Sequence, residues 1–359
     1  MNIKRTCSEK VIVIIGVLIL LLVAVTGCNS GSQQQEDVVY ITQTGPANML
    51  SQLGAKEIDG FVAWEPFNAE AVLGQDGKYL AMSGEIWPNH PCCILAANID
   101  YQDDKVLSAV TWAHVKATRF INNPENKERV IEYAMEFTAK NREVVVEALK
   151  TIHFVEYPNV DEFEAYYSQL KAGGLLTKDF ADIGYSEKEE FFSNFFVDSY
   201  YQEVSKQLKK DSQWVPQKVN SQVQLHLGFL TKDLHEFAVY VAQKEGFYQD
   251  VGLIPGANLE FVNFTNGVAA MEGFKNNDVD ISYLGGAPAT LKRINDDIGI
   301  KVIAGANEEG SAIVVRPDAG IDDFSDLKGK TIAIPAIGTV QYYLLEKALN
   351  DSNLKTQVK

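Results

Sequence analysis

The residues of this chain that are best suited to hold a small ligand lie at two similar corners of the sequence. One corner is Gly285 to Pro288 (G-G-A-P), and the other is Trp64 to Pro66 (W-E-P). Each follows an acidic residue and a short apolar run. Its proline begins a helical pattern, where the first N–H needs no intrahelical partner. Such a corner directs free backbone N–H groups and the positive end of a helix dipole at a ligand. This arrangement suits a sulfonate, nitrate, carboxylate or phosphate.

Two further corners, Thr44 to Pro46 and Gly338-Thr339, also place small residues before a helical pattern. Ligands of open α/β sheets bind beyond the carboxyl ends of the strands. Corners from both halves of the chain therefore predict a cleft between two lobes, although each could be an ordinary turn between a strand and a helix. The candidate ligand-binding residues are Thr44, Trp64, Glu65, His235, Gly285, Gly286, Ala287, Glu309, Gly338 and Thr339.

Trp64 is expected to form a wall of this cleft, by stacking on a flat or apolar part of the ligand or by holding a cation over its ring. The alternative is a core tryptophan at the lobe interface. Glu65, Glu308 and Glu309 oppose a purely anionic ligand, because a carboxylate within a few ångströms repels it by about 1–4 kcal/mol. Either these acids point to solvent or the ligand also carries an amine or ring N–H. His235, in the first helical turn after an expected strand, could contact the ligand or only cap and pack.

The cysteines Cys92 and Cys93 are neighbours in the sequence, so they cannot form a disulfide framework. With His90 they leave open a vicinal disulfide or a soft metal site, whereas buried free cysteines are the more ordinary interpretation. The sequence does not decide their redox state.

The composition and motifs argue against several classes of protein. A net charge of −16 opposes nucleic-acid binding, which requires a basic face. The sequence contains no nucleophile–base–orienter set, Walker loop, G-x-G-x-x-G motif or spaced Cys/His cluster. We therefore expect a binding protein with no catalytic residue, no metal and no cofactor.

The amino-terminal segment has the pattern of a lipoprotein export signal. Lys4, Arg5 and Lys10 precede an apolar run over 11–25, which ends in Thr26-Gly27-Cys28. We expect residues 1–27 to be a signal peptide, Cys28 to carry lipid and residues 28–37 to form a flexible tether. The protein would then be extracytoplasmic and anchored to the cell membrane. The alternative, a permanent transmembrane anchor, needs about 20 apolar residues.

Alternating strands and helices are needed to position the four corners. Expected strands are 38–42, 60–64, 79–82, 93–97 and 223–230, and expected helices are 47–54, 67–73, 106–121, 125–137, 142–151, 160–170 and 340–350. Residues 191–210 are also helical in pattern, and alternation resumes after 223. Such alternation predicts an α/β fold with mostly parallel sheets and covering helices.

Several motifs together resemble one family of binding proteins. They include V-Q-L-H-L-G-F-L from Val223, K-E-G-F-Y from Lys244, G-G-A-P from Gly285, D-L-K-G-K-T-I-A-I-P from Asp326 and A-W-E-P-F from Ala63. The chain resembles the solute-binding proteins of ABC importers in the nitrate/sulfonate/bicarbonate (taurine-like) and thiamine-precursor group, over residues 38–175 and 223–354.

This resemblance implies a type II periplasmic-binding-protein-like fold with two lobes. Lobe 1 would comprise residues 98–313, and lobe 2 would comprise 38–97 with 314–359. It also implies capture of a small organic oxyanion or related solute and delivery to an ABC permease with its ATPase. A thiamine-precursor pyrimidine or another heterocycle is the alternative solute, and an enzyme on the same fold is a further alternative. The identity of the solute stays open.

The order of the halves departs from this family, in which the W-E-P-F region follows the D-L-K-G-K region. Joining Lys355 back to Val38 would restore the usual order, so the chain reads as circularly permuted. The strand from Val38 should then pair in one sheet with Thr331 to Pro335. The alternative is an out-of-phase piece of a tandem array, whose halves could close between two molecules instead of within one.

Overall fold

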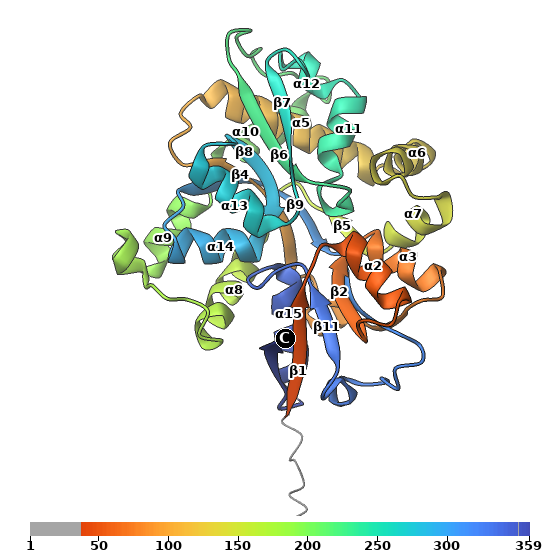
Figure 1. Cartoon of the computed structure of the whole chain (residues 1–359). Helices are drawn as coiled ribbons and strands as arrows, with labels where there is room; N and C mark the ends of the chain where they lie inside the picture. The colour runs from red at the N-terminus through yellow and green to blue at the C-terminus, as the bar shows by residue number, and fades with distance from the viewer. Residues whose placement is uncertain (1–36, 351) are drawn as a thin grey trace, which may run out of the picture. The chain divides into compact units, whose positions relative to one another are not determined.

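The computed structural model describes residues 37–350 and 352–359. They form two six-stranded sheets, each covered by helices (Figure 1). Sheet A contains β1 (Val38–Gln43), β2 (Gly60–Trp64), β3 (Lys78–Met82), β10 (Ser311–Val315), β11 (Thr331–Ile334) and β12 (Lys355–Val358). Sheet B contains β4 (Pro91–Asn98), β5 (Ile152–Phe154), β6 (Leu225–Leu230), β7 (Leu259–Phe264), β8 (Ile281–Gly285) and β9 (Ile300–Glu309). The predicted α/β, two-lobed periplasmic-binding-protein-like fold is confirmed. The predicted signal peptide, Cys28 and nearly all of the tether lie outside the described residues.

The helices lie between strands and cover the sheets. In the first part of the chain they are α2 (Pro46–Gly54), α3 (Phe67–Leu73), α4 (Ser83–Ile86), α5 (Asp104–Asn122), α6 (Lys127–Thr138), α7 (Arg142–Ala148), α8 (Val160–Ala172), α9 (Lys188–Phe195) and α10 (Ser199–Lys210). In the second part they are α11 (Ala238–Lys244), α12 (Phe247–Asp250), α13 (Gly267–Asn276), α14 (Gly286–Asn295) and α15 (Val340–Asn350). The helical stretch expected over 191–210 is interrupted where Phe196 bridges to Val302 of β9.

The buried strands explain why the sheets form. Every residue of β2 is buried, as expected for a strand that is covered on both faces. Because side chains alternate along a strand, Val62 packs into one apolar cluster of sheet A while Phe61 and Ala63 pack into the cluster on the other face. Sheet A has the order β12-β1-β11-β2-β10-β3, and sheet B has the order β5-β9-β4-β8-β6-β7.

The chain crosses between the sheets twice. One crossing joins β9 to β10 at Gly310, whose φ of 82° suits glycine. The other runs from α4 to β4. These crossings differ from the predicted lobe boundaries at 97/98 and 313/314, because β4 pairs antiparallel with β8 and β9 and so belongs to sheet B.

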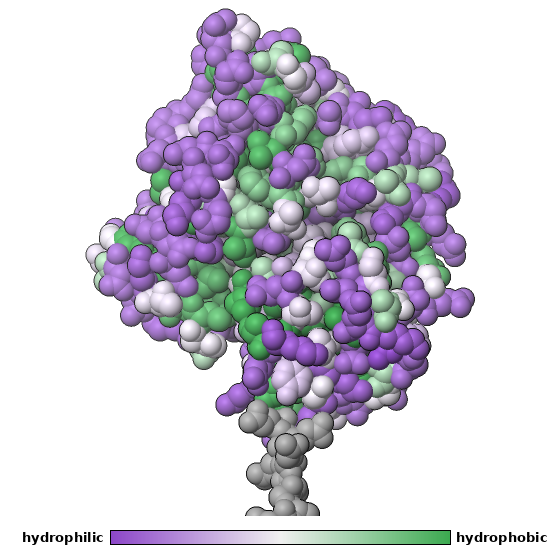
Figure 2. Space-filling view, viewed as in Figure 1, coloured by the Kyte–Doolittle hydropathy of each residue, from purple (hydrophilic) through white to green (hydrophobic). Residues whose placement is uncertain are grey.

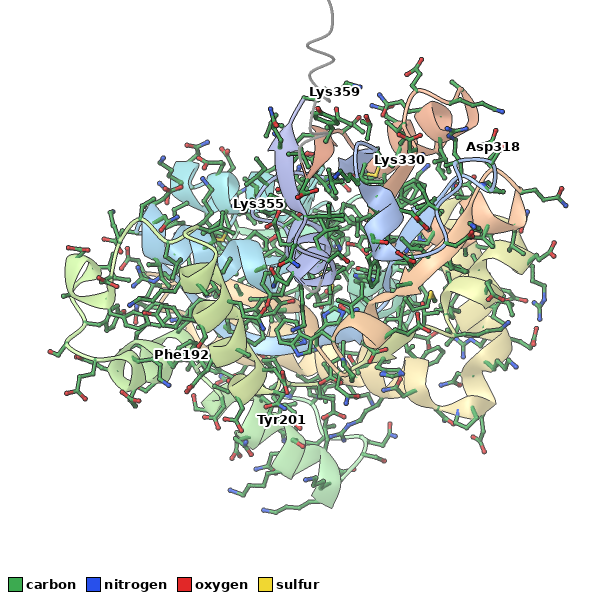
Figure 3. All side chains as sticks on the ribbon, turned by 90° about the horizontal axis from the view of Figure 1, so that it is seen from below. Phe192, Tyr201, Asp318, Lys330, Lys355 and Lys359 are labelled. Carbon is green, nitrogen blue, oxygen red and sulfur yellow. The ribbon has the colours of Figure 1, made fainter. Side chains whose placement is uncertain are left out.

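The two ends of the described chain meet in sheet A. Strand β1 lies parallel to β11, with Tyr40 opposite Thr331. Strand β12, which the sequence interpretation did not include, follows α15 and lies parallel to β1 on its other side, with Val38 opposite Lys355. Lys355 and Lys359 mark the two ends of this last segment in Figure 3. Its K-T-Q-V sequence is short and mostly polar, as is common for edge strands.

Candidate functional site

A narrow cavity lies where residues of sheets A and B meet. Its lining residues are Trp64, Cys92, Cys93, Leu230, Asp233, Gly267, Gly285, Pro288, Thr339, Val340 and Gln341. The cavity volume is about 10 Å³, roughly the space for one water molecule. The cleft is therefore nearly closed in this structure. On the face seen in Figure 2 the surface is mostly hydrophilic, and hydrophobic residues gather between α14 and α15.

Three helices begin at this cavity. Gly267 opens α13, Gly285 precedes α14, and Thr339 precedes α15, so two helices come from the sheet B side and one from the sheet A side. The first N–H groups of a helix have no intrahelical partner and carry the positive end of its dipole. No lysine or arginine is among the described residues that line the cavity. The N–H groups at these helix starts are therefore available to an anion in the cavity.

The lobes are in close contact at Gly338. Its φ is 86°, a left-handed conformation that glycine adopts without strain. A Cβ atom at this position would lie 2.5 Å from Cδ2 of Leu291 on α14. A glycine at this corner therefore permits both the backbone turn before α15 and the contact with the other lobe.

Trp64 and Glu65 are both buried at the end of β2. The Trp64 ring lies edge-on to Phe67 with 6.3 Å between centroids, and its buried indole Nε1 has no hydrogen-bond partner among the described residues. One carboxylate oxygen of Glu65 accepts the Ala69 N–H at 3.1 Å. Burial raises the pKa of Glu65 from its usual 4.5 to about 7. Glu65 therefore does not point to solvent, and much of it is neutral near neutral pH.

Cys92, which lines the cavity, pairs with His235 behind the wall. Cys92 lies on β4, and its Sγ is 3.2 Å from Nδ1 of His235, 143 residues further along the chain. The opposite nitrogen of His235, Nε2, lies 2.8 Å from the carbonyl oxygen of Gly310. His235 itself sits in a short turn after β6, where the Asp233 carboxylate accepts its N–H at 2.9 Å.

The electrostatics of this pair favour charge separation. Burial alone would lower the pKa of His235, but the adjacent Cys92 and Asp233 raise it to about 10. Burial likewise opposes ionisation of Cys92, yet the hydrogen bond from Cys93 and the nearby His235 hold the pKa of Cys92 well below its usual range. The two shifts agree with a thiolate beside an imidazolium.

Two further carboxyl groups are buried beside the pair. Burial raises the pKa of Asp233 to about 7, although His235 opposes this shift. Burial and the neighbouring Asp233 raise the pKa of Glu236 well above its usual range. One oxygen of Glu236 accepts the Leu230 N–H, and the other has no partner among the described residues. Two buried thiols and one buried acid therefore line the cavity, and a second acid, Glu236, lies beside them.

The structure brings some of the predicted residues to the cavity and places others around it. Trp64, Gly285 and Thr339 line it. Gly286, Ala287 and Gly338 are sequence neighbours of lining residues and are not in the lining themselves. Glu65 and His235 lie behind the wall and are tied together, because Leu234 N–H donates to the Glu65 carbonyl and Glu65 N–H donates to the Gly310 carbonyl.

Thr44 and Glu309 lie outside the lining. The Thr44 N–H donates to the Ile334 carbonyl at 3.0 Å, beyond the end of β1. The Glu309 carboxylate accepts the Asn89 N–H at 2.8 Å, beside the crossing at Gly310. Glu309 therefore pairs with the segment that joins the sheets.

Sequence reasoning missed five lining residues: Gly267, Leu230, Asp233, Val340 and Gln341. Asn266-Gly267 follows β7 and opens α13, which is the same kind of corner as those selected, so this signal was present. Gln341 donates to Ser311 Oγ at 3.0 Å and offers no signal of its own in the sequence. Cys92 and Cys93 were noted for their chemistry, but their position in the cavity was not foreseen.

Two family models match the chain. The model of the NMT1-like family matches residues 21–135, and the model described as NMT1/THI5 like matches residues 235–358. The motifs from Ala63, Lys244, Gly285 and Asp326 lie within these matched segments, and the motif from Val223 lies just before the second.

Curated proteins resemble shorter parts of the chain. The nitrate/nitrite binding protein NrtA of Nostoc sp. is 28% identical over 102 residues, which are 28% of this chain and 23% of that protein. A putative aliphatic sulfonates-binding protein of Bacillus subtilis is 31% identical over 97 residues, which are 26% of this chain and 29% of that protein. The nitrate import ATP-binding protein NrtC of Synechocystis sp. is 26% identical over 106 residues, 29% of this chain and 16% of that protein. The chain thus spans less than a third of the length of these relatives.

The motifs, the two-sheet fold and these matches agree with one another. NrtA and the Bacillus subtilis relative are named as binding proteins and not as enzymes. The chain is thus similar to the NMT1-like and NMT1/THI5-like families and to binding proteins named for nitrate/nitrite and for aliphatic sulfonates.

Proposed function

We propose that this chain is an extracytoplasmic, lipid-anchored binding protein that captures a small organic oxyanion or related solute and delivers it to an ABC permease with its ATPase. The observation that carries this proposal is the meeting of three helix N-termini, those of α13, α14 and α15, at one cavity between the sheets. Aliphatic sulfonates, named for one relative, are organic oxyanions, and nitrate, named for another, is a related inorganic oxyanion.

The cavity suits an anion that is held by backbone groups. Each helix N-terminus stabilises a nearby negative charge by about 0.3–1 kcal/mol at an exposed site and up to about 2 kcal/mol when partly buried. The contributions come from both lobes, so the complete site exists only when the lobes close. In this proposal the N–H of Gly286 donates a hydrogen bond and Trp64 supplies an aromatic wall, while Thr44 and Thr339, which donate to the Ile334 and Ala336 carbonyl oxygens here, would turn to the solute on binding.

The buried acids do not contradict an anionic solute. Glu65 and Asp233 have pKa values raised to about 7 by burial, so proton uptake can remove their charge near neutral pH. A protonated carboxyl group donates a hydrogen bond and no longer repels an anion. A solute with an amine or ring N–H would instead use these groups as acceptors.

That second possibility supports a heterocyclic solute as the alternative. The ring of Trp64 and the buried carboxyl of Asp233 both line the cavity and could hold a pyrimidine by stacking and N–H···O bonds. A titration with pyrimidines beside the oxyanions distinguishes the two solute classes.

Membrane attachment is proposed through lipid on Cys28, which lies outside the described residues. No helix within residues 37–350 and 352–359 is long and apolar enough to cross a bilayer. The pattern of basic residues, apolar run and Gly27-Cys28 supports attachment by a lipid.

The proposal includes the circularly permuted order of the two halves. The parallel pairing of β1 with β11 supports it, because this pairing places the strand from Val38 where the usual order requires a strand after α15. Strand β12 follows α15 directly but lies beyond β1. Closure of the cleft between two copies remains the alternative arrangement.

Native mass spectrometry of the full chain in detergent tests the proposed function and the arrangement together. We expect one chain to retain one small solute, and we expect nitrate or an aliphatic sulfonate at 100 times its dissociation constant to stabilise the chain by about 2.7 kcal/mol. A chain that retains no solute and is stabilised by no oxyanion or pyrimidine would refute the function. Solute bound only by dimers would favour the exchanged arrangement.

A further inference from the structure

Three potential metal ligands converge at the wall of the interlobe cavity. The Sγ atoms of Cys92 and Cys93 and a ring nitrogen of His235 all lie within 4.8 Å of one another, and all three residues are buried. We propose that these residues bind a thiophilic transition-metal ion such as Zn²⁺. Cys92 and Cys93 also line the cavity, so the ion would lie at its edge.

The distances fit one tetrahedral ion. With Zn–S bonds of about 2.3 Å and a Zn–N bond of about 2.0–2.1 Å, tetrahedral angles place two sulfurs about 3.8 Å apart and a sulfur and a nitrogen about 3.5 Å apart. The two Sγ atoms are 3.9 Å apart. Cys92 Sγ lies 3.2 Å from Nδ1 of His235. Movements of a few tenths of an ångström would bring these two pairs to this geometry, and the third pair, Cys93 Sγ with a ring nitrogen of His235, lies within 4.8 Å.

The second nitrogen of His235 is held as metal-binding histidines require. Nε2 lies 2.8 Å from the Gly310 carbonyl oxygen, so an N–H on Nε2 donates to that oxygen, and Nδ1, once it gives up its proton, can bind a metal ion beside Cys92 Sγ. A side chain at position 310 would collide with the imidazole, and φ there is 82°. The crossing between the sheets therefore fixes the orientation of this ligand.

The surroundings of the cluster favour a cation. Buried carboxyl groups of Asp233 and Glu236 lie with Cys93 in a second group whose potential ligand atoms are within 4.8 Å of one another. One oxygen of Glu236 and one of Glu65 are buried without a partner among the described residues. A buried carboxyl oxygen without a hydrogen-bond partner is costly, and a bound cation nearby would offset that cost. A fourth coordination position would face the cavity, where Asp233 is available.

A metal titration distinguishes a metal site from a structural thiol–imidazole pair that binds no metal. The full chain, purified with reductant and stripped by a chelator, is titrated with Co²⁺ and then with Zn²⁺. We expect one Co²⁺ per chain, a thiolate-to-cobalt charge-transfer absorption in the near ultraviolet, and loss of that absorption when Zn²⁺ replaces Co²⁺.

Variants identify the ligands. Loss of a residue that only supports a metal ligand costs about 10–100-fold in metal affinity. Loss of a ligand itself should cost at least as much, so Cys92→Ser, Cys93→Ser and His235→Gln should each weaken metal binding by about 100-fold or more. His114→Gln is the matched control, because His114 is also buried but bonds to the Tyr283 hydroxyl, at 3.1 Å. The control should keep the affinity of the unaltered chain.

X-ray absorption of the zinc-loaded, unaltered chain needs no variant and covers the case in which a substitution prevents folding. We expect two sulfur neighbours and at least one nitrogen neighbour. Absence of a charge-transfer band in the unaltered chain, an ion surrounded by oxygen alone, or full binding by the Cys92→Ser/Cys93→Ser double variant would overturn the proposal.

Discussion

Replacement of Glu65 by glutamine should stabilise the protein in a pH-dependent way. The side chain is 1% exposed, and burial raises its pKa from 4.5 to about 7. An acid whose pKa is higher in the folded chain than in the unfolded chain takes up a proton on folding between those two values. The folded state is therefore penalised increasingly as pH rises from 4.5, and the full penalty is reached above about pH 7.

The size of the effect follows from this difference in pKa. At 1.36 kcal/mol per pH unit, a pKa raised by about 2.5 corresponds to about 3 kcal/mol. Glutamine resembles the protonated acid, and its oxygen can still accept the Ala69 N–H. Glu65→Gln should therefore change the free energy of unfolding by less than about 1 kcal/mol near pH 5 and increase it by up to about 3 kcal/mol near pH 8.

Urea unfolding of the chelator-treated, solute-free chain at both pH values measures this difference. Glu57→Gln, which alters an exposed carboxylate just before β2, is the control and should change stability by less than about 0.5 kcal/mol at either pH. An equal effect of Glu65→Gln at both pH values, or a less stable variant near pH 8, would refute the reasoning about a desolvated acid.

Three further changes test the cleft and the anchor. Trp64→Phe keeps an aromatic wall but removes the buried N–H that has no partner among the described residues. If that N–H donates to an anion, solute binding measured by calorimetry should weaken by about 1.5–3 kcal/mol. Normal binding by this variant would place Trp64 in the core only. Gly338→Ala should weaken solute binding about tenfold or more, because its Cβ would meet Leu291 across the cleft. Gly320→Ala, also at a positive φ but with no atom within 4 Å of its Cβ, should leave affinity unchanged, and equal losses in both variants would contradict the closure argument. Cys28→Ser should abolish lipid labelling and release the protein from membranes or leave it unprocessed, and unchanged processing with membrane retention would contradict the lipoprotein interpretation.

The elements that the sequence predicted well are those with strong local signals. β2 and α3 have the expected bounds, because five apolar residues and a proline corner mark them clearly. Asn141 and Asn159 accept N–H groups of the helices that follow them, as helix-capping residues do. Strand β12 was not predicted, because it is short and polar. It is held by its pairing with β1, which no local sequence pattern reveals.

The candidate site was only partly predictable for the same reason. The corners at Trp64, Gly285 and Thr339 combine small or aromatic residues with a helix start, which is visible in the sequence. The contact between Cys92 and His235 joins residues 143 positions apart, and it depends on β4 entering sheet B instead of closing sheet A. Such a contact follows from the order of strands, which the motifs do not specify.

Isothermal titration of the full chain with nitrate, bicarbonate and an aliphatic sulfonate tests the central claim most directly. If three helix N-termini form an anion site in the cleft, at least one of these anions should bind saturably with one site per chain, and Gly338→Ala should weaken that binding while Gly320→Ala should not. A folded chain that binds none of the three anions, or that binds one equally well in both variants, would contradict the account.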